Sequence, residues 1–324
     1  MNRTWSINEY GEPYAGDTGF VAKCRLLQSI YRVEIGEQIR PYKGRDRVYY
    51  LGNYIEHGES SGANFLEEYI FAYAKYRLAY KRPYETINSD RLYNNLLSSQ
   101  PMAFNLFCPL KRMLNERPSA ATLALRAALP DHRIAEVTDV ELEYIPANYM
   151  ELSGDKSAMD AIIRFVDEDG YKSFIAIETK YSENLGTNVA YDTDENGNKT
   201  PRQQSIKAVK RLKCFSPDLE RDIINGDIAL TQIYRNFLLS EMYGLEEGLH
   251  AYSIILAPRE HHPSTERELD SLTNRLSDEY KGKIKQIYLE DFVNRLIANS
   301  PSEYSATFGK FYDRYLNFDK VNTK

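Results

Sequence analysis

Apolar residues in the first part of the chain recur with the spacing of a helix. In residues 64–80 they stand three or four positions apart, which predicts a helix that ends at Pro83. Residues 91–97 and 120–129 predict two more helices. The residues before this region mix glycine, proline, tyrosine and charge without a regular period, and only residues 47–54 have the composition of a strand. The first part of the chain is therefore expected to be mainly helical.

The middle of the chain changes to the alternation of β-strands. In residues 135–145 apolar and acidic side chains alternate, and residues 157–166 and 172–181 form two further apolar runs. An Asp-Gly pair, which favours a tight hairpin turn, separates the last two runs. Together the three runs predict an antiparallel meander. Residues 184–201 are rich in glycine, asparagine, aspartate and threonine, and they predict a loop.

The last third of the chain predicts a helix, a strand, and then further helices. Asp227 follows a glycine and is expected to cap the first of these helices. Residues 250–257 are a short apolar run before a proline, which is typical of a buried strand. Thr265 and Glu268 have the spacing of a capping box at the start of another helix. A strand at residues 284–289 and two closing helices complete the prediction.

This order of elements predicts the α/β fold class, with a mixed sheet flanked by helices. The fourth strand follows a long helical connection, so it can join the meander in parallel. We expect the chain to divide into three parts. Residues 1–60 form an N-terminal extension, residues 61–260 form the core, and residues 261–324 form a C-terminal helical extension packed on the core.

Charge and cysteine content exclude several classes of protein. The chain has 324 residues, with 41 Lys and Arg against 47 Asp and Glu, so its formal net charge of −6 excludes nucleic-acid binding by bulk charge. Three scattered cysteines supply neither a disulfide framework nor a zinc site. No signal-peptide core, apolar span of about 20 residues or phosphate-binding glycine loop occurs. We expect a soluble cytoplasmic protein with no membrane contact and no nucleotide cofactor.

Three charged residues stand out in the two strands after the acidic one. Asp160 lies in an apolar strand, where a carboxylate is costly unless it is paired or binds a cation. Glu178 and Lys180 project from the same face of the next strand, because strand side chains alternate. A hairpin between the two strands would bring Asp160 close to Glu178. Two carboxylates and an amine can hold Mg²⁺ and orient a water, but a structural ion pair would give the same pattern.

A second set of residues has the same formal spacing. Asp270, Glu279 and Lys281 also match an Asp followed by Glu-x-Lys. They fall in a polar, helical stretch, where charged residues are most simply a solvated face. The surrounding sequence therefore favours the set that contains Asp160.

The predicted order and three short stretches resemble a known family. The stretches are LLSSQPMAFNLF, IAIETKYSE and QIYRNFLL, at residues 96–107, 175–183 and 232–239. With a core of order αβββαβ, they resemble the PD-(D/E)XK nuclease superfamily, and within it a bacterial family of restriction-endonuclease-like proteins. The resemblance implies a restriction-endonuclease-like core with extra N- and C-terminal helices.

The resemblance also implies roles for individual residues. Asp160 and Glu178 would be ligands of Mg²⁺, for which Mn²⁺ would substitute, and the backbone carbonyl of Thr179 would be a third ligand. Lys180 would position the attacking water. Met159 stands where the motif that names the superfamily has proline, a position that varies and is structural.

Supporting roles remain open between function and structure. The superfamily often has another acidic or amide group on the preceding helix, and the candidates are Gln100, Glu68 and its neighbour Glu67. The alternative is a turn cap or a surface acid, and this alternative is favoured for Glu67 and Glu68 individually. Glu183 and Arg235 match the family stretches and are expected to support the site, although Arg235 could pair with a carboxylate instead of phosphate.

A basic run directly after the third strand indicates where nucleic acid would bind. Residues 199–214 contain six Lys and Arg and no Asp or Glu, although such a run is by default a solvated face. The residues expected to contact DNA are Arg202, Lys207, Lys210, Arg211 and Lys213.

Two functions are compatible with these features. The first is a Mg²⁺-dependent DNA endonuclease of restriction or defence type, expected to be a homodimer because double-strand cleavage needs two sites. The second is a non-catalytic nucleic-acid-binding or assembly protein that keeps the fold. Among enzymes, an exonuclease or repair nuclease would use the same residues.

Overall fold

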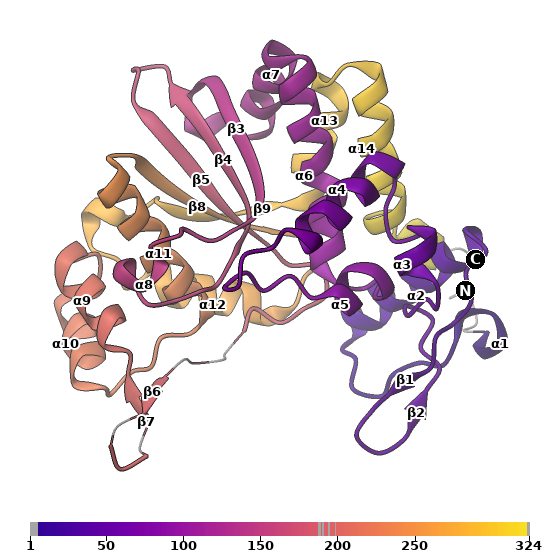
Figure 1. The fold of residues 1–324 in the computed structure, drawn as a ribbon, viewed down its shortest axis with the longest axis horizontal. Coiled ribbons are helices and arrows are strands. Elements are labelled where there is room, and N and C mark those ends of the chain that lie inside the picture. Colours follow the sequence, from indigo (N-terminus) through magenta and orange to yellow (C-terminus); the bar gives the residue numbers. More distant parts are fainter. Residues whose placement is uncertain (1–5, 187–188, 190, 194, 198, 323–324) are drawn as a thin grey trace.

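A five-stranded mixed sheet forms the centre of the protein (Figure 1). The computed structural model describes residues 6–186, 189, 191–193, 195–197 and 199–322. The sheet order is β3-β4-β5-β8-β9, and two small hairpins, β1-β2 and β6-β7, lie outside it. The strands are β1 (Tyr42–Lys43), β2 (Val48–Tyr49), β3 (Ile134–Tyr144), β4 (Met159–Asp167), β5 (Lys172–Thr179), β6 (Tyr191–Thr193), β7 (Lys199–Pro201), β8 (His250–Ala257) and β9 (Ile284–Tyr288).

Helices account for most of the remaining chain. Those before and within the meander are α1 (Ile7–Tyr10), α2 (Gly19–Glu34), α3 (Gly58–Ser61), α4 (Glu68–Ala79), α5 (Ser89–Asn94), α6 (Ser99–Glu116), α7 (Pro118–Ala128) and α8 (Tyr149–Leu152). Those after it are α9 (Gln203–Leu212), α10 (Pro217–Asn225), α11 (Gln232–Glu247), α12 (Pro263–Thr273), α13 (Leu289–Asn299), α14 (Ser302–Tyr315) and α15 (Asp319–Asn322). Short 3₁₀ turns occur at Pro130–His132 and Asp278–Tyr280.

The predicted antiparallel meander is confirmed. Strand β3 pairs with β4 and β4 pairs with β5, both antiparallel. Gly170 takes φ +85° in the turn between β4 and β5, a conformation that glycine adopts without strain. Ala161 pairs with Ile177 near the end of this hairpin, and the same register carried one residue further sets Asp160 opposite Glu178. Hairpin register therefore brings the two carboxylates together.

The crossover after β5 returns the chain to the sheet in parallel. Helices α9, α10 and α11 follow one another before β8, which pairs with β5 in parallel, and β9 pairs with β8 in parallel. A helical crossover of this length is what a parallel neighbour requires. The α/β class with a mixed sheet is confirmed.

Alternating strand residues divide the core into two hydrophobic clusters, one on each face of the sheet. On one face, Ile163 and Ile175 pack in a cluster with residues of α6, α7, α13 and α14. On the other face, Ile162 and Phe174 pack with residues of α9, α10, α11 and α12. Figure 1 shows α6, α7, α13 and α14 together on one side of the sheet, away from α9 and α10. Glu178 shares the strand face of Phe174, so it projects toward α11.

Buried polar contacts tie the two ends of the chain to the middle. The Arg314 guanidinium of α14 is almost fully buried, and it donates to the Asn64 carbonyl at 2.8 Å and to the Gln28 side chain at 3.2 Å. Gln28 of α2 in turn donates to the hydroxyl of Tyr181 at 3.1 Å. Tyr181 follows Lys180, so α2 and α14 help to hold the chain just after β5.

Helix α6 was missed because its prolines resemble breaks. Pro101 falls in its first turn, where a missing N–H is tolerated, and the hydroxyl of Ser98 caps it by accepting from the Gln100 N–H at 3.2 Å. Pro109 lies inside the helix. The amide of Asn105 bonds to the Asn64 carbonyl and to the Tyr315 hydroxyl, which anchors α6 near this proline.

Several predicted boundaries were wrong. Asp227 does not cap α11, because Gly226 ends α10 in a left-handed conformation and α11 begins only at Gln232. The capping box at Thr265 does not start α12, whose N-cap is His262, with Pro263 as the first helical residue.

Other segments differ in extent. The helix expected at 64–80 begins at Glu68, and the strand expected at 47–54 is reduced to the two residues of β2. Helices α9 and α10 were not predicted. The loop expected at 184–201 includes β6 and β7, and some of its residues lie outside those described. Across the described chain, none of the helices combines the length and the apolar character needed to span a membrane.

Packing predicts that α14 is required for stability. Phe308 of α14 is fully buried in the same cluster as the sheet residues, so Phe308→Ala should lower the free energy of unfolding by about 3–5 kcal/mol. Leu123→Ala on α7 is the control, because Leu123 is 57% exposed and its loss should change stability by less than about 0.5 kcal/mol. Urea denaturation measures both; equal midpoints for the two variants would show that α14 is not part of the core.

Candidate active site

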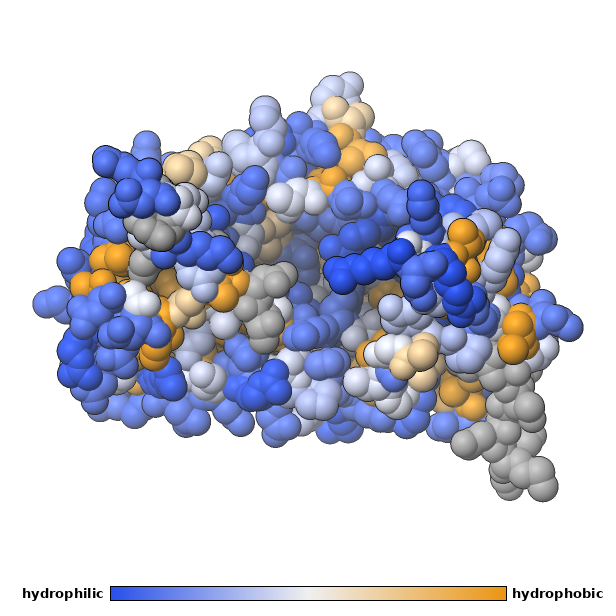
Figure 2. Space-filling view, turned by 90° about the horizontal axis from the view of Figure 1, so that it is seen from below, coloured by the Kyte–Doolittle hydropathy of each residue, from blue (hydrophilic) through white to orange (hydrophobic). Residues whose placement is uncertain are grey.

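A polar cavity of about 350 Å³ lies where β5 ends and β4 begins. Figure 2 shows a face of the molecule hollowed near its middle, with hydrophilic residues around the hollow. Elements far apart in sequence supply the cavity lining, from α5 and α6 to α11. Its charged lining residues are Arg91, Glu143, Asp155, Lys156, Asp160, Glu178, Lys180, Arg202 and Arg235.

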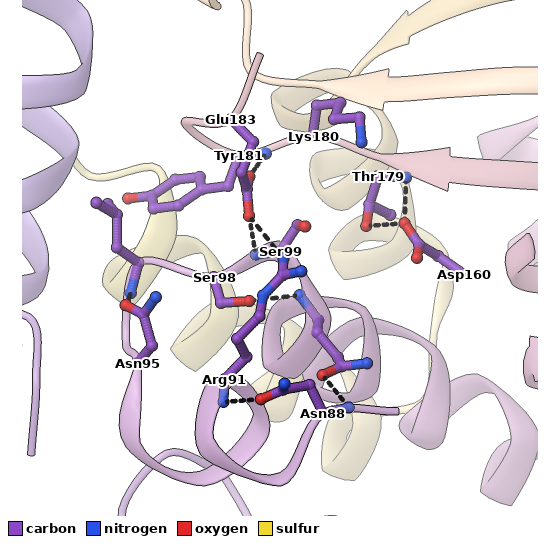
Figure 3. Close-up of polar contacts among 12 residues, drawn as sticks. Asn88, Arg91, Asn95, Ser98, Ser99, Asp160, Thr179, Lys180, Tyr181 and Glu183 are labelled. Carbon is purple, nitrogen blue, oxygen red and sulfur yellow. Dashed lines mark hydrogen bonds and ion pairs between the residues drawn. The ribbon is translucent and has the colours of Figure 1, made fainter. Parts of the chain in front are cut away.

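Asp160 is fixed by the residue that follows Glu178. The backbone N–H and the hydroxyl of Thr179 both donate to Oδ2 of Asp160, at 2.7 and 2.6 Å (Figure 3). Burial raises the pKa of Asp160 well above its ordinary value, and the charges of Glu178 and Glu143 raise it further. The charge of Lys180 and the Thr179 bonds oppose this shift. A divalent cation at this place would relieve the same repulsion.

Glu178 is oriented by α11. Gln232, in the first turn of α11, donates its amide N–H to Oε1 of Glu178 at 2.9 Å, and Asn236 donates to Oε2 at 2.9 Å. These two residues are four positions apart and therefore lie on one face of the helix. Lys180 directly follows β5, and its Nζ lies 2.6 Å from Oε1 of Glu178, so the two side chains project to the same side as expected.

Lys180 stays protonated because it is surrounded by carboxylates. Burial lowers the pKa of Lys180, but the charges of Glu178 and Asp160 outweigh burial, so its pKa is raised overall. A protonated amine can orient a water or stabilise a developing negative charge. As a general base it would first have to lose this proton.

Glu143 completes the acidic side of the cavity, and sequence reasoning missed it. Glu143 of β3 is buried and accepts a hydrogen bond from the Gln100 amide at 3.1 Å. Burial raises the pKa of Glu143 to about 7, although the Gln100 bond and the charge of Arg77 lower it. The alternation of 135–145 is typical of a strand with one solvated acidic face. Strand register is the signal that could have found Glu143. Leu142 pairs with Ala161 and Tyr144 pairs with Met159, so Glu143 lies opposite Asp160.

We call Glu143, Asp160 and Glu178 the acidic wall. Gln100 lies beside this wall in the first turn of α6, as expected for a residue just before a proline. Its amide is oriented at both ends, because its Oε1 accepts from the Asn88 N–H at 3.3 Å while its nitrogen donates to Glu143.

Glu183 positions the segment after β5 rather than lining the cavity. Its carboxylate accepts from the Ser99 N–H at 2.6 Å and from the Tyr181 N–H at 3.1 Å (Figure 3). Ser99 is the first residue of α6, so Glu183 also meets the positive end of that helix. Arg91 lies 3.7 Å from the same carboxylate. This contact holds the Lys180 segment against the helix that carries Gln100.

Arg235 pairs with a carboxylate while lining the cavity. Its Nε donates to Asp155 Oδ2 at 2.7 Å, and its Nη1 donates to the Leu230 carbonyl at 2.9 Å. Arg202 Nη1 reaches the same Asp155 oxygen at 3.2 Å and the Gly154 carbonyl at 2.8 Å. Arg202, directly before α9, and Arg235, in α11, both line the cavity.

Other residues singled out in the sequence lie away from the cavity lining. Glu68 is exposed in the first turn of α4, and Glu67 pairs with Lys310 at 2.8 Å, so the structure does not bring either acid to Asp160. The remaining basic residues expected to contact DNA are exposed on or just after α9 and do not line the cavity: Lys207, Lys210, Arg211 and Lys213. Arg211 pairs with Glu246 at 3.0 Å.

The alternative set is separated and exposed. Asp270 lies on α12, and Glu279 and Lys281 lie around a 3₁₀ turn, all three in solvent. Lys281 pairs with Asp278 instead of Glu279. The surrounding sequence selected the set that lines a cavity.

The acidic wall fits a hard divalent cation. Among residues 6–186 and the later described positions, no three His, Cys, Asp or Glu side chains form a ready metal cluster. Mg²⁺ needs no such cluster, because it keeps several waters and binds one or two carboxylates with phosphate oxygens. Asp160 and Glu178 supply two carboxylates, and about 350 Å³ exceeds the roughly 30 Å³ that each water takes in the liquid.

The chain belongs to the PD-(D/E)XK nuclease superfamily. The model of this superfamily matches residues 15–317, nearly the whole chain, and the mixed sheet agrees with it. The match includes most of the first 60 residues and nearly all of the C-terminal helices. No curated protein and no solved structure matches the chain.

Burial of Glu143 predicts a pH-dependent cost to stability. Its pKa rises from 4.5 to about 7 on folding, so the folded state binds the proton more tightly and loses stability as pH rises through this window. Glu143→Gln removes the titration and retains an acceptor for Gln100. In EDTA, the variant should gain roughly 2 kcal/mol more stability over wild type at pH 8 than at pH 5. Urea denaturation at the two pH values measures this gain, and an equal gain at both would contradict the assigned cause.

Proposed function

We propose that this chain is a Mg²⁺-dependent DNA endonuclease of restriction or defence type. The observation that carries the proposal is the meeting of Asp160, Glu178 and Lys180 at one cavity, in a chain of a nuclease superfamily. Mn²⁺ substitutes for Mg²⁺ in this account, since both accept hard oxygen ligands.

Each of these residues has a defined task in phosphodiester hydrolysis. Asp160 and Glu178 would hold the cation, with the backbone carbonyl of Thr179 as a third ligand. A cation held there would supply a lower pKa for water and would neutralise charge on the phosphodiester. Lys180 orients the attacking water and stabilises the charge that develops on phosphate, which its protonated state suits. Gln232 and Asn236 keep Glu178 in the orientation that this task requires.

Positive charge outside the cavity would hold the rest of the DNA. Lys207, Lys210 and Arg211 project from the exposed face of α9, with Lys213 just beyond it. Contacts of this kind depend on salt rather than on base sequence. Double-strand cleavage requires two such sites, so a homodimer is part of the proposal.

A non-catalytic protein that keeps the fold is the second candidate. The close Lys180–Glu178 pair is the feature that favours it, because a purely structural ion pair has the same geometry. Cavity space beside both side chains favours the enzyme instead. An exonuclease or repair nuclease would use the same chemistry and differ only in its need for DNA ends.

Substitution of the three residues tests the proposal directly. Purified protein should cleave DNA with Mg²⁺ or Mn²⁺ and leave 5′-phosphate ends. Asp160→Asn, Glu178→Gln and Lys180→Met should each reduce the cleavage rate by roughly 10²-fold or more while the fold is retained. Gel analysis of linear and circular plasmid DNA measures the rate and separates endonuclease from exonuclease products.

The exposed alternative set provides matched controls. Asp270→Asn, Glu279→Gln and Lys281→Met make the same three chemical changes outside the cavity, and each should cleave at the wild-type rate. Cleavage that persists in all three cavity variants would refute the site. Absence of cleavage by the wild-type protein, over a range of DNA substrates and both metals, would favour the non-catalytic candidate.

A further inference from the structure

The cavity has a second wall of opposite charge. We call Arg91, Lys156, Arg202 and Arg235 the basic wall, and all four line the cavity that also contains Asp160. Asp155 also lines the cavity beside these four residues, and Lys180 lines it beside the acidic wall. The cavity therefore has a mainly basic side and a mainly acidic side.

Two members of the basic wall are held in place before any ligand binds. Asp155 is almost fully buried, and one of its oxygens accepts from both Arg235 and Arg202, at 2.7 and 3.2 Å. The carbonyls of Leu230 and Gly154 fix the two guanidiniums further. Arg202 and Arg235 therefore share one oxygen of Asp155, and both guanidinium groups are held at the cavity in a preorganised position. Preorganised cations bind an anion with less loss of conformational freedom.

The remaining members can approach an anion more freely. The side chain of Arg91 is 53% exposed and its nearest carboxylate, on Glu183, is 3.7 Å away. Lys156 is exposed and directly follows Asp155 in the chain. Arginine and lysine both bind phosphate, arginine through paired N–H groups and lysine as a point charge.

Cavity size allows a group at each of the two walls. A volume of about 350 Å³ exceeds the roughly 30 Å³ that one water takes in the liquid, so the cavity has space for several groups of that size. Both walls line this same space. A phosphate at each wall would therefore belong to neighbouring nucleotides of one strand.

We propose that the basic wall binds a second phosphate of the nucleic-acid strand, next to the phosphodiester held at the acidic wall. The ligand is a phosphate group of a single strand, either an internal phosphodiester or a terminal phosphomonoester. This inference rests on the proposed function for the identity of the first phosphate. The role of the basic wall is to hold the strand so that the neighbouring phosphodiester lies at the acidic wall.

Binding in EDTA tests the inference separately from cleavage. The probe is a 3′-fluorescein-labelled single-stranded thymidine octamer, measured by fluorescence anisotropy from 25 to 200 mM NaCl. Arg202→Gln should weaken binding about tenfold and reduce the slope of log K against log salt by about 0.7, the value for one phosphate contact on a single strand. Asp155 keeps Arg235 as a partner in this variant, so the fold should be retained.

Two further variants complete the design. Lys156→Gln removes an exposed charge from the basic wall and should give a similar loss with no change in folding. Arg221→Gln is the control, because Arg221 is 62% exposed on α10, pairs with Asp218 and does not line the cavity. It should bind as wild type does.

Comparison of 5′-phosphorylated and 5′-hydroxyl octamers identifies the source of the phosphate. If Arg202→Gln weakens binding only of the phosphorylated octamer, the basic wall binds a strand terminus; an equal loss for both assigns it to an internal phosphate. Wild-type affinity and salt slope in both basic-wall variants would overturn the inference, as would absence of binding by the wild type. These measurements do not depend on cleavage, so the two proposals can fail separately. A protein that cleaves DNA while its basic-wall variants bind as wild type would refute only this inference. A protein that binds through the basic wall but does not cleave would refute only the proposed function.

Discussion

Burial of three neighbouring carboxylates at the end of the β4–β5 hairpin is the constraint on which the site depends. Glu143, Asp160 and Glu178 come from three adjacent strands and meet at one cavity, where burial and their own charges raise the pKa of Asp160 and burial raises that of Glu143. Lys180 offsets only part of this charge. Perturbed pKa values of buried carboxylates are common at functional sites. The chain belongs to a superfamily of nucleases, which agrees with a functional site at this place.

The rest of the fold holds these groups against their repulsion. Two hydrophobic clusters fix the sheet from both faces, and the face toward α11 sets Gln232 and Asn236 against Glu178. Glu183 joins the end of β5 to the start of α6, while Gln28 and Arg314 connect the same segment to both ends of the chain. The helices outside the αβββαβ order therefore contribute to the position of Lys180.

Local patterns in the sequence were sufficient for the meander and for the nearness of Asp160 to Glu178, because alternation and an Asp-Gly turn predict the hairpin. They left the register open, and the structure pairs Ala161 with Ile177. These patterns were insufficient where one signal has two meanings. Helix α6, which contains Pro101 and Pro109, was not predicted, and Gly226 marks the end of α10 instead of the start of α11. Glu143 was overlooked because alternation along one strand does not reveal which neighbour covers it. The clustering of Arg202 with Arg235 required the tertiary fold, since 33 positions separate them.

Direct observation of a cation at the acidic wall would test whether its carboxylates form a metal site. Crystals soaked in Mn²⁺ near pH 7.5 can be measured at the manganese absorption edge. We expect an anomalous peak between Asp160 and Glu178, about 2.0–2.2 Å from a carboxylate oxygen of each. An acidic wall without a peak at millimolar Mn²⁺, with Lys180 still paired to Glu178, would contradict it.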